Sequence, residues 1–171
     1  IAVKEDGGKD GYNALKLGFQ ESEKISRPEK GVFGKLKLPG MKVLKEFRID
    51  NVSEFATGTV LKADVFVVGD TVMVQGKTKG RGFQGVIKRH KFSGGKESHG
   101  VRSKRIPGSI GASSDPSRVI RGKKMPGHYG NAKMTVRGLE VLKVDPDKNV
   151  IIVKGAIPGA RNGIVFVTKQ A

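Results

Sequence analysis

The feature that most constrains this fold is a block of uneven charge between residues 76 and 137. The block carries sixteen Lys and Arg residues and only two acids, Glu97 and Asp115, which gives a net charge of +14. The rest of the chain carries seventeen bases and fourteen acids, a net charge of +3. Like-charge repulsion and the backbone entropy of twelve Gly residues oppose compaction of the block by itself. We therefore expect a near-neutral body with a basic insert that serves a densely anionic partner.

Outside the block, the chain consists of short β-rich segments separated by turn residues. Residues 26–29 (Ser-Arg-Pro-Glu) predict the start of one short helix, which ends before Pro39. Strands are expected over residues 12–19 (as an edge strand), 43–49, 60–68, 71–74, 134–144, 150–153 and 164–168. Short strands with little helix indicate a mainly β fold, either a small β-barrel or a β-sandwich.

This pattern predicts how the chain is divided. We expect a body built from residues 1–75 and 138–171, with residues 76–137 as a long, irregular, basic extension inserted between two strands. The chain has no Cys, which excludes disulfides and thiolate metal sites. It has no apolar run of the roughly 18 residues that a membrane span needs, so no membrane partner is expected. Because the chain starts at Ile1 within a polar stretch, we also expect an N-terminal segment to precede it.

One glycine motif has two possible meanings. Gly80, Gly82 and Gly85 satisfy the G-x-G-x-x-G pattern of dinucleotide-binding folds. Such a fold needs a βαβ unit and a carboxylate about 20 residues later, where this chain has Lys104 and Arg105. We favour glycines that let the backbone approach phosphates closely; a plain flexible turn is the remaining alternative.

The histidines give no sign of a metal or catalytic site. His90, His99 and His128 lie at least nine residues apart, which fits no common compact metal pattern. No acid is placed beside Ser98–His99 to orient an imidazole for catalysis. We therefore expect no metal, no cofactor, no small-molecule substrate and no enzymatic activity. In a basic segment, imidazoles more plausibly contact phosphate or stack on bases.

The cations of the block favour RNA as the partner. Pro107, Pro116 and Pro126 recur at intervals of nine and ten residues and stiffen the segment, as in an arm. Ordering such an arm costs about 1–2 kcal/mol per residue, which contacts with phosphates can offset. No helix-turn-helix or zinc-finger pattern is visible, and an irregular arm suits folded RNA. A solvated charge run and a DNA-architectural protein are the alternatives.

The predicted contact residues are therefore the cations and imidazoles of the block. Those expected to bind RNA phosphates or bases are Lys77, Lys79, Arg81, Lys88, Arg89, His90, His99, Arg102, Lys104, Arg105, Arg118, Arg121, Lys123, Lys124, His128, Lys133 and Arg137. Close backbone approach is expected at Gly80, Gly82, Gly85, Gly108 and Gly111. Phe83 and Tyr129 are further candidates for stacking or packing at the RNA surface.

Several segments in and after the block occur in a familiar order. They are GRGFQGVIKRHKF (80–92), SHG (98–100), RIPGSIG (105–111), GKKMPGHYGN (122–131) and VKGAIPG (153–159), with DGYNALKLGF (10–19) and KEFRI (45–49) as weaker matches. Together they resemble the ribosomal protein L3 family of the large subunit, of the bacterial and organellar type.

The resemblance implies a structural constituent of the large ribosomal subunit with a translation-factor-like β-barrel. It implies that a loop over about residues 100–133, with its tip near residues 107–115, reaches toward the peptidyl transferase centre in large-subunit RNA. It also implies a role in subunit assembly, neighbouring ribosomal proteins as further partners, and a missing first barrel strand. The expected location is the ribosome, in the bacterial cytoplasm or a plastid.

The chain departs from the family pattern at two positions. Ala112 stands where bacterial relatives often have a methylated Gln, so no such modification is expected there. His90 stands where many relatives have Trp, which implies weaker stacking by this ring.

Overall fold

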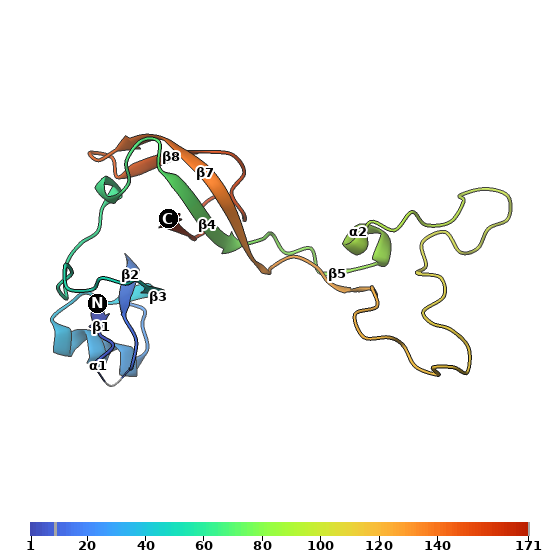
Figure 1. Ribbon diagram of the computed structural model, residues 1–171, viewed down its shortest axis with the longest axis horizontal. Helices are drawn as coiled ribbons and strands as arrows, with labels where there is room; N and C mark the ends of the chain where they lie inside the picture. The colour runs from blue at the N-terminus through green and yellow to red at the C-terminus, as the bar shows by residue number, and fades with distance from the viewer. Residues whose placement is uncertain (9, 171) are drawn as a thin grey trace. The chain divides into compact units, whose positions relative to one another are not determined.

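The computed structural model describes residues 1–8 and 10–170, which form two compact units, Ile1–Lys62 and Ala63–Ala171 (Figure 1). Every strand pairing among these residues is antiparallel. Helix is limited to two α-helices and one 3₁₀ turn within the same residues. The prediction of a mainly β fold with little helix is therefore confirmed.

The first unit is a three-stranded sheet with one helix. Its strands β1 (Ala2–Lys4), β2 (Ala14–Glu21) and β3 (Met41–Arg48) lie in the order β1-β2-β3. The prediction of a strand at residues 12–19 is thus right, but its placement at an edge is wrong. Strand β2 pairs with β3 on one side and with β1 on the other, so it is the central strand. The short N-terminal β1 carries no alternation that would have revealed it.

Helix α1 (Arg27–Leu36) begins where the sequence predicts. The Glu29 carboxylate accepts hydrogen bonds from the Ser26 hydroxyl at 2.7 Å and from the Ser26 backbone amide at 3.0 Å. These contacts favour the ionised carboxylate and hold the pKa of Glu29 below its ordinary value. The carboxylate also lies in the first turn, where it complements the helix dipole.

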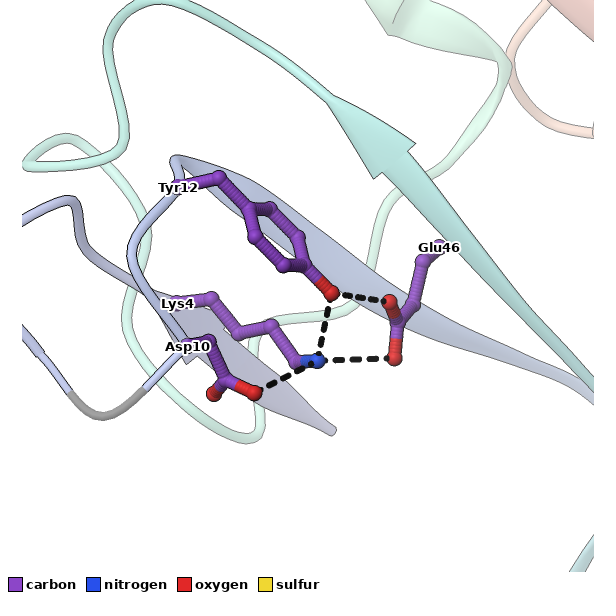
Figure 2. A network of polar contacts seen from close by, with 4 residues as sticks. All are labelled: Lys4, Asp10, Tyr12 and Glu46. Carbon is purple, nitrogen blue, oxygen red and sulfur yellow. Dashed lines mark hydrogen bonds and ion pairs between the residues drawn. The ribbon is translucent and has the colours of Figure 1, made fainter.

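A polar network joins β1, β3 and the loop between β1 and β2 (Figure 2). The Lys4 ammonium lies 2.8 Å from the Tyr12 hydroxyl and 3.2 Å from carboxylate oxygens of Asp10 and Glu46. Tyr12 in turn donates to Glu46 at 3.0 Å. The hydrogen bond to Tyr12 and the two carboxylates raise the pKa of Lys4, so this side chain stays protonated. Its positive charge is paired with carboxylates of its own unit.

The second unit is built on a four-stranded sheet in the order β8-β7-β4-β9. Its strands are β4 (Thr71–Lys77), β7 (Lys133–Asp145), β8 (Val150–Lys154) and β9 (Val165–Lys169). They confirm the strands predicted at 71–74, 134–144, 150–153 and 164–168. Alternate β-branched and Leu residues point to one face and form the core, which consists of Val72, Val74, Leu139 and Val141.

The strand predicted over residues 60–68 is wrong. Only a 3₁₀ turn, η1 (Ala63–Val65), forms there. Polar side chains bind backbone amides of this segment, because Asn149 Oδ1 accepts from the Ala63 amide at 2.7 Å and Asp70 Oδ2 accepts from the Val67 amide at 2.9 Å. The Val67 amide, together with the Lys169 ammonium, holds the pKa of Asp70 below its ordinary value.

The predicted closure into a barrel is not confirmed either. The described strands form three open sheets of three, four and two strands. In the four-stranded sheet, β8 and β9 remain edges that do not pair with each other. A barrel requires hydrogen bonds between its first and last strands, and periodicity in the sequence cannot specify those pairs.

Candidate nucleic-acid interface

A narrow two-stranded ribbon continues the sheet beyond β4 and β7. Thr78 donates to the Ala132 carbonyl at 2.9 Å, and Arg81 and Tyr129 are joined by a backbone hydrogen bond of 2.9 Å. Further along, β5 (Phe83–Gln84) pairs with β6 (Gly127–His128). We call residues 78–84 and 127–132 the stalk; Figure 1 shows its two strands side by side, in green and orange.

The stalk depends on one glycine at which its strands come very close. A Cβ added at Gly130 would lie 2.1 Å from the Lys79 carbonyl oxygen and 3.0 Å from the Arg81 amide nitrogen. Gly130 also has a φ of +77°, which side-chain-bearing residues rarely adopt. Gly130 is not among the residues predicted from the sequence, where the turn-forming pair Gly130–Asn131 is the available signal.

A short helix closes the far end of the stalk. In α2 (Val86–His90), the Arg89 guanidinium donates to the Met125 carbonyl at 2.7 Å, and His90 Nε2 lies 3.1 Å from the same oxygen. Both side chains are half-buried. Arg89 and His90, predicted as RNA contacts, therefore direct polar atoms at their own chain. This pairing spans about 35 residues, so no local pattern could have predicted it.

Between α2 and β6 lies a segment without regular structure. In residues 91–126 no residue belongs to a helix or strand, and none is buried. One internal crossing occurs where the Gly95 amide donates to the Lys104 carbonyl at 3.0 Å. Residues 91–95, 103 and 106–108 line a shallow hollow beside this crossing. We call residues 91–126 the arm.

The predicted cations of the stalk and the arm are exposed to solvent. Apart from Arg89 and His90, every predicted contact residue is exposed. Lys91 and Lys96, which were not among the predicted contacts, are equally exposed and share the same environment. Lys77 and Lys133 lie directly opposite each other where the stalk leaves the sheet, an arrangement of like charges that is unfavourable without a nearby anion.

None of these cations forms an ion pair with a residue that the structure describes. Over residues 1–8 and 10–170, the ion pairs join Lys4 to Asp10 and Glu46, Lys154 to Glu140, and Lys169 to Asp70. All of them lie outside residues 76–137. The sixteen Lys and Arg side chains of the block therefore form no ion pair with the part of the chain that the structure describes.

The glycines predicted to approach phosphates have open surroundings. At Gly82, Gly85 and Gly108 an added Cβ would meet no protein atom within 4 Å, and at Gly80 and Gly111 it would make only ordinary contacts of 3.7 and 3.5 Å. At Gly82 and Gly108 a positive φ, +66° and +77°, itself favours glycine. At Gly80, Gly85 and Gly111 neither the φ angle nor the packing of the chain explains the absence of a side chain. Close approach of a partner remains a prediction.

Other kinds of site find little support in the geometry. The G-x-G-x-x-G segment forms β5 and α2, and because β5 pairs antiparallel with β6, the βαβ unit of a dinucleotide fold does not form. The described residues contain no cluster of three or more His, Asp or Glu side chains able to hold a metal ion. Within those residues, no helix has the length and apolar character that crossing a membrane requires.

Comparison with known proteins identifies the family. A family model described as ribosomal protein L3 matches residues 37–150, which is more than half of the chain. The large ribosomal subunit protein uL3 of Thermotoga petrophila is 47% identical over 167 residues, covering 98% of this chain and 81% of the relative. The chain belongs to the ribosomal protein L3 family.

Further relatives agree with this assignment. The uL3 protein of Thermosipho africanus is 48% identical over 98% of this chain and 82% of its own length. That of Syntrophus aciditrophicus is 45% identical over 100% of this chain and 79% of its own length. The resemblance found in the sequence motifs is confirmed. These relatives are bacterial, so they give no support to the expected alternative of a plastid source.

Proposed function

We propose that this chain is a structural constituent of the large ribosomal subunit and binds large-subunit ribosomal RNA. Residues 76–137 are the RNA-binding extension in this proposal, and residues 1–75 and 138–171 are the body. The observation that carries it is the set of sixteen cations in the extension without a single ion pair to the described residues. Membership of the ribosomal protein L3 family supports ribosomal RNA as the polyanion.

The charge distribution explains why the partner is a polyanion. Exposed cations that repel one another lose that repulsion when phosphates lie between them, and the counterions displaced from RNA add a favourable entropy. The seven cations of the arm between residues 102 and 124 are all exposed. Contacts by these side chains would make binding strongly dependent on salt.

The family's loop over about residues 100–133, which overlaps the arm, is proposed to extend into folded RNA toward the peptidyl transferase centre. Its tip would lie near residues 107–115. The absence of buried residues in residues 91–126 supports this, since such a segment has no core of its own to hold one conformation. An RNA that folds around the arm would order both partners together, which gives the chain its proposed role in subunit assembly.

This role involves no catalysis, cofactor or small-molecule substrate. Neighbouring proteins of the large subunit are the other proposed partners, and the ribosome is the proposed location. The residues proposed to contact RNA are the exposed members of the predicted set, with Lys91 and Lys96 added on the strength of their equal exposure.

Competition binding tests the proposal. The purified chain is titrated with complete large-subunit ribosomal RNA at fixed salt, in the presence of either unlabelled duplex DNA or unlabelled ribosomal RNA. We expect ribosomal RNA to compete far better than an equal mass of duplex DNA. Equal competition would instead indicate a general polyanion-binding or DNA-architectural protein. Co-sedimentation with large-subunit particles through a moderate salt wash is the second expected result.

A further inference from the structure

The two-residue strands β5 and β6 have two unlike faces. Neighbouring residues in a strand point to opposite sides, and directly opposed residues on paired strands share a side. Phe83 pairs with His128, and Gln84 pairs with Gly127. One face of the stalk tip therefore carries Phe83 and His128, and the other carries Gln84 and Gly127.

The Gln84–Gly127 face is covered by the protein itself. A Cβ added at Gly127 would lie 2.6 Å from the Arg89 guanidinium, so the Arg89 side chain packs directly against the Gly127 backbone. Arg89 is held there by its 2.7 Å hydrogen bond to the Met125 carbonyl. The Gln84 amide is likewise engaged, because it donates to the Arg81 carbonyl.

The opposite face is open and aromatic. Phe83 is 75% exposed, more than any other Phe described in the chain, and His128 beside it is exposed as well. Phe83 contributes to no hydrophobic cluster of the protein. A large apolar ring that stays 75% exposed on a hydrogen-bonded ribbon gains little for folding, so its position requires another explanation.

Tyr129 and His90, two other ring candidates near the stalk, already have partners in the protein. The Arg81 guanidinium lies 5.3 Å from the centre of the Tyr129 ring and covers a half-buried side chain. His90 is within hydrogen-bonding distance of the Met125 carbonyl, and its ring lies 6.2 Å from that of Phe92, which is half-buried. Among the described residues, only the Phe83–His128 face combines an exposed ring with an exposed imidazole on paired strands.

We propose that the Phe83–His128 face is a stacking platform for one unpaired nucleobase of RNA. Bases stack on exposed aromatic rings whatever their identity, while cations nearby hold the adjoining phosphates. Lys79, Arg81 and Lys88 are exposed, lie within five residues of Phe83 along the chain, and form no ion pair with the described residues. The positive charge around the platform therefore favours a nucleic acid as the partner. The planar ring favours an unpaired base, because the face of a paired base is covered by its neighbours in the helix.

This inference rests on the proposed function, and its test separates the two. The full chain and its Phe83→Leu and Phe83→Tyr variants are titrated with complete large-subunit ribosomal RNA, transcribed in vitro, over a range of salt concentrations. Phe19→Leu is the matched control, because Phe19 is 61% exposed in the first unit. Leu keeps the apolar character at position 83 but removes the aromatic face, and Tyr retains that face.

We expect Phe83→Leu to weaken binding roughly five- to a hundredfold. The salt slope should be unchanged, since no phosphate contact is lost, and Phe83→Tyr and Phe19→Leu should bind like the parent chain. Irradiation of the complex with ultraviolet light should also attach a nucleotide to the Phe83 peptide and not to the Phe19 peptide.

Equal binding by Phe83→Leu together with an unmodified Phe83 peptide would overturn the platform and leave the proposed function standing. A lowered salt slope in Phe83→Leu that Phe83→Tyr shares would also overturn it, because the loss would then come from displaced cations. Failure of the parent chain to bind the RNA would overturn both proposals.

Discussion

The charges of the body and those of the extension are arranged in opposite ways. In the body, Lys4 is enclosed by Asp10, Tyr12 and Glu46, and Lys169 lies 2.9 Å from Asp70. In the extension, residues 76–137, no Lys or Arg forms an ion pair with a described residue. The same residue types therefore form ion pairs within the body but form none with the described residues in the extension.

The two regions also differ in how their backbones are held. The four-stranded sheet buries the side chains of Val72, Val74, Leu139 and Val141 on one face, whereas no residue in 91–126 is buried. Because hydrophobic burial is the main force that opposes conformational entropy, the sheet has a source of stability that the arm lacks. The comparison can be tested at four points.

The largest expected effect comes from neutralising the arm. Replacing seven exposed cations by Gln should lower the salt slope of RNA binding by roughly five and weaken binding by several orders of magnitude at low salt. The positions are Arg102, Lys104, Arg105, Arg118, Arg121, Lys123 and Lys124. Filter binding to large-subunit ribosomal RNA at several salt concentrations measures both quantities.

A matched control removes the same charge from the body. The seven exposed lysines to replace by Gln are Lys24, Lys30, Lys35, Lys42, Lys62, Lys143 and Lys148. This variant should keep most of its affinity. Equal losses in the two variants would mean that net charge alone governs binding and that the comparison between regions is wrong.

The next effect concerns the stalk. Gly130→Ala should destabilise the stalk by roughly 1–3 kcal/mol, through a strained positive φ and a clash with the Lys79 carbonyl. Amide exchange should accelerate at Arg81 and Tyr129, whose backbone hydrogen bonds hold the ribbon together. Gly138→Ala is the control, since its φ is +72° but no atom lies within 4 Å of an added Cβ. An equally large local effect at Gly138 would show that φ strain, and not the close crossing, is responsible.

A smaller effect distinguishes folding from binding at Gly85. This residue is the N-cap of α2, a position where Ser is favoured, and an added Cβ meets nothing within 4 Å. Gly85→Ser should therefore leave the thermal unfolding temperature unchanged or slightly raised. If RNA approaches this backbone closely, its affinity should fall roughly tenfold through one lost contact. Unchanged affinity in the same filter assay would remove Gly85 from the predicted approach positions.

The smallest effect belongs to the Lys4 network. The Lys4 ammonium and the Tyr12 hydroxyl hold the pKa of Glu46 below its ordinary value of 4.5. A depressed carboxyl pKa contributes stability that is complete above the ordinary value and is lost as the pH falls through the depressed one. Glu46→Gln should therefore lower the urea midpoint of the first unit slightly at pH 7, and the difference should vanish in strong acid. Glu23→Gln, an exposed residue outside the network, should show no such pH-dependent difference.

The sequence was most informative where local chemistry decides the structure. Helix α1 begins at residue 27 because Ser26 and Glu29 interact within one turn, and β7 follows its alternating apolar residues. The charge block and the family motifs likewise depend only on which residues follow one another. The strand predicted at residues 60–68 was wrong for a non-local reason, since the Asn149 side chain, 86 residues away, bonds to the Ala63 amide.

The sequence by itself determined the block of basic charge, the main strands, the short helix and the family. Only the tertiary structure decided that β2 is a central strand, that the sheets stay open, and that Arg89 and His90 turn toward Met125. It also decided that one face of the stalk tip is covered while Phe83 stands open on the other. The reason is physical: propensity, charge and periodicity act between near neighbours, whereas strand order and the exposure of a ring depend on which distant segments meet.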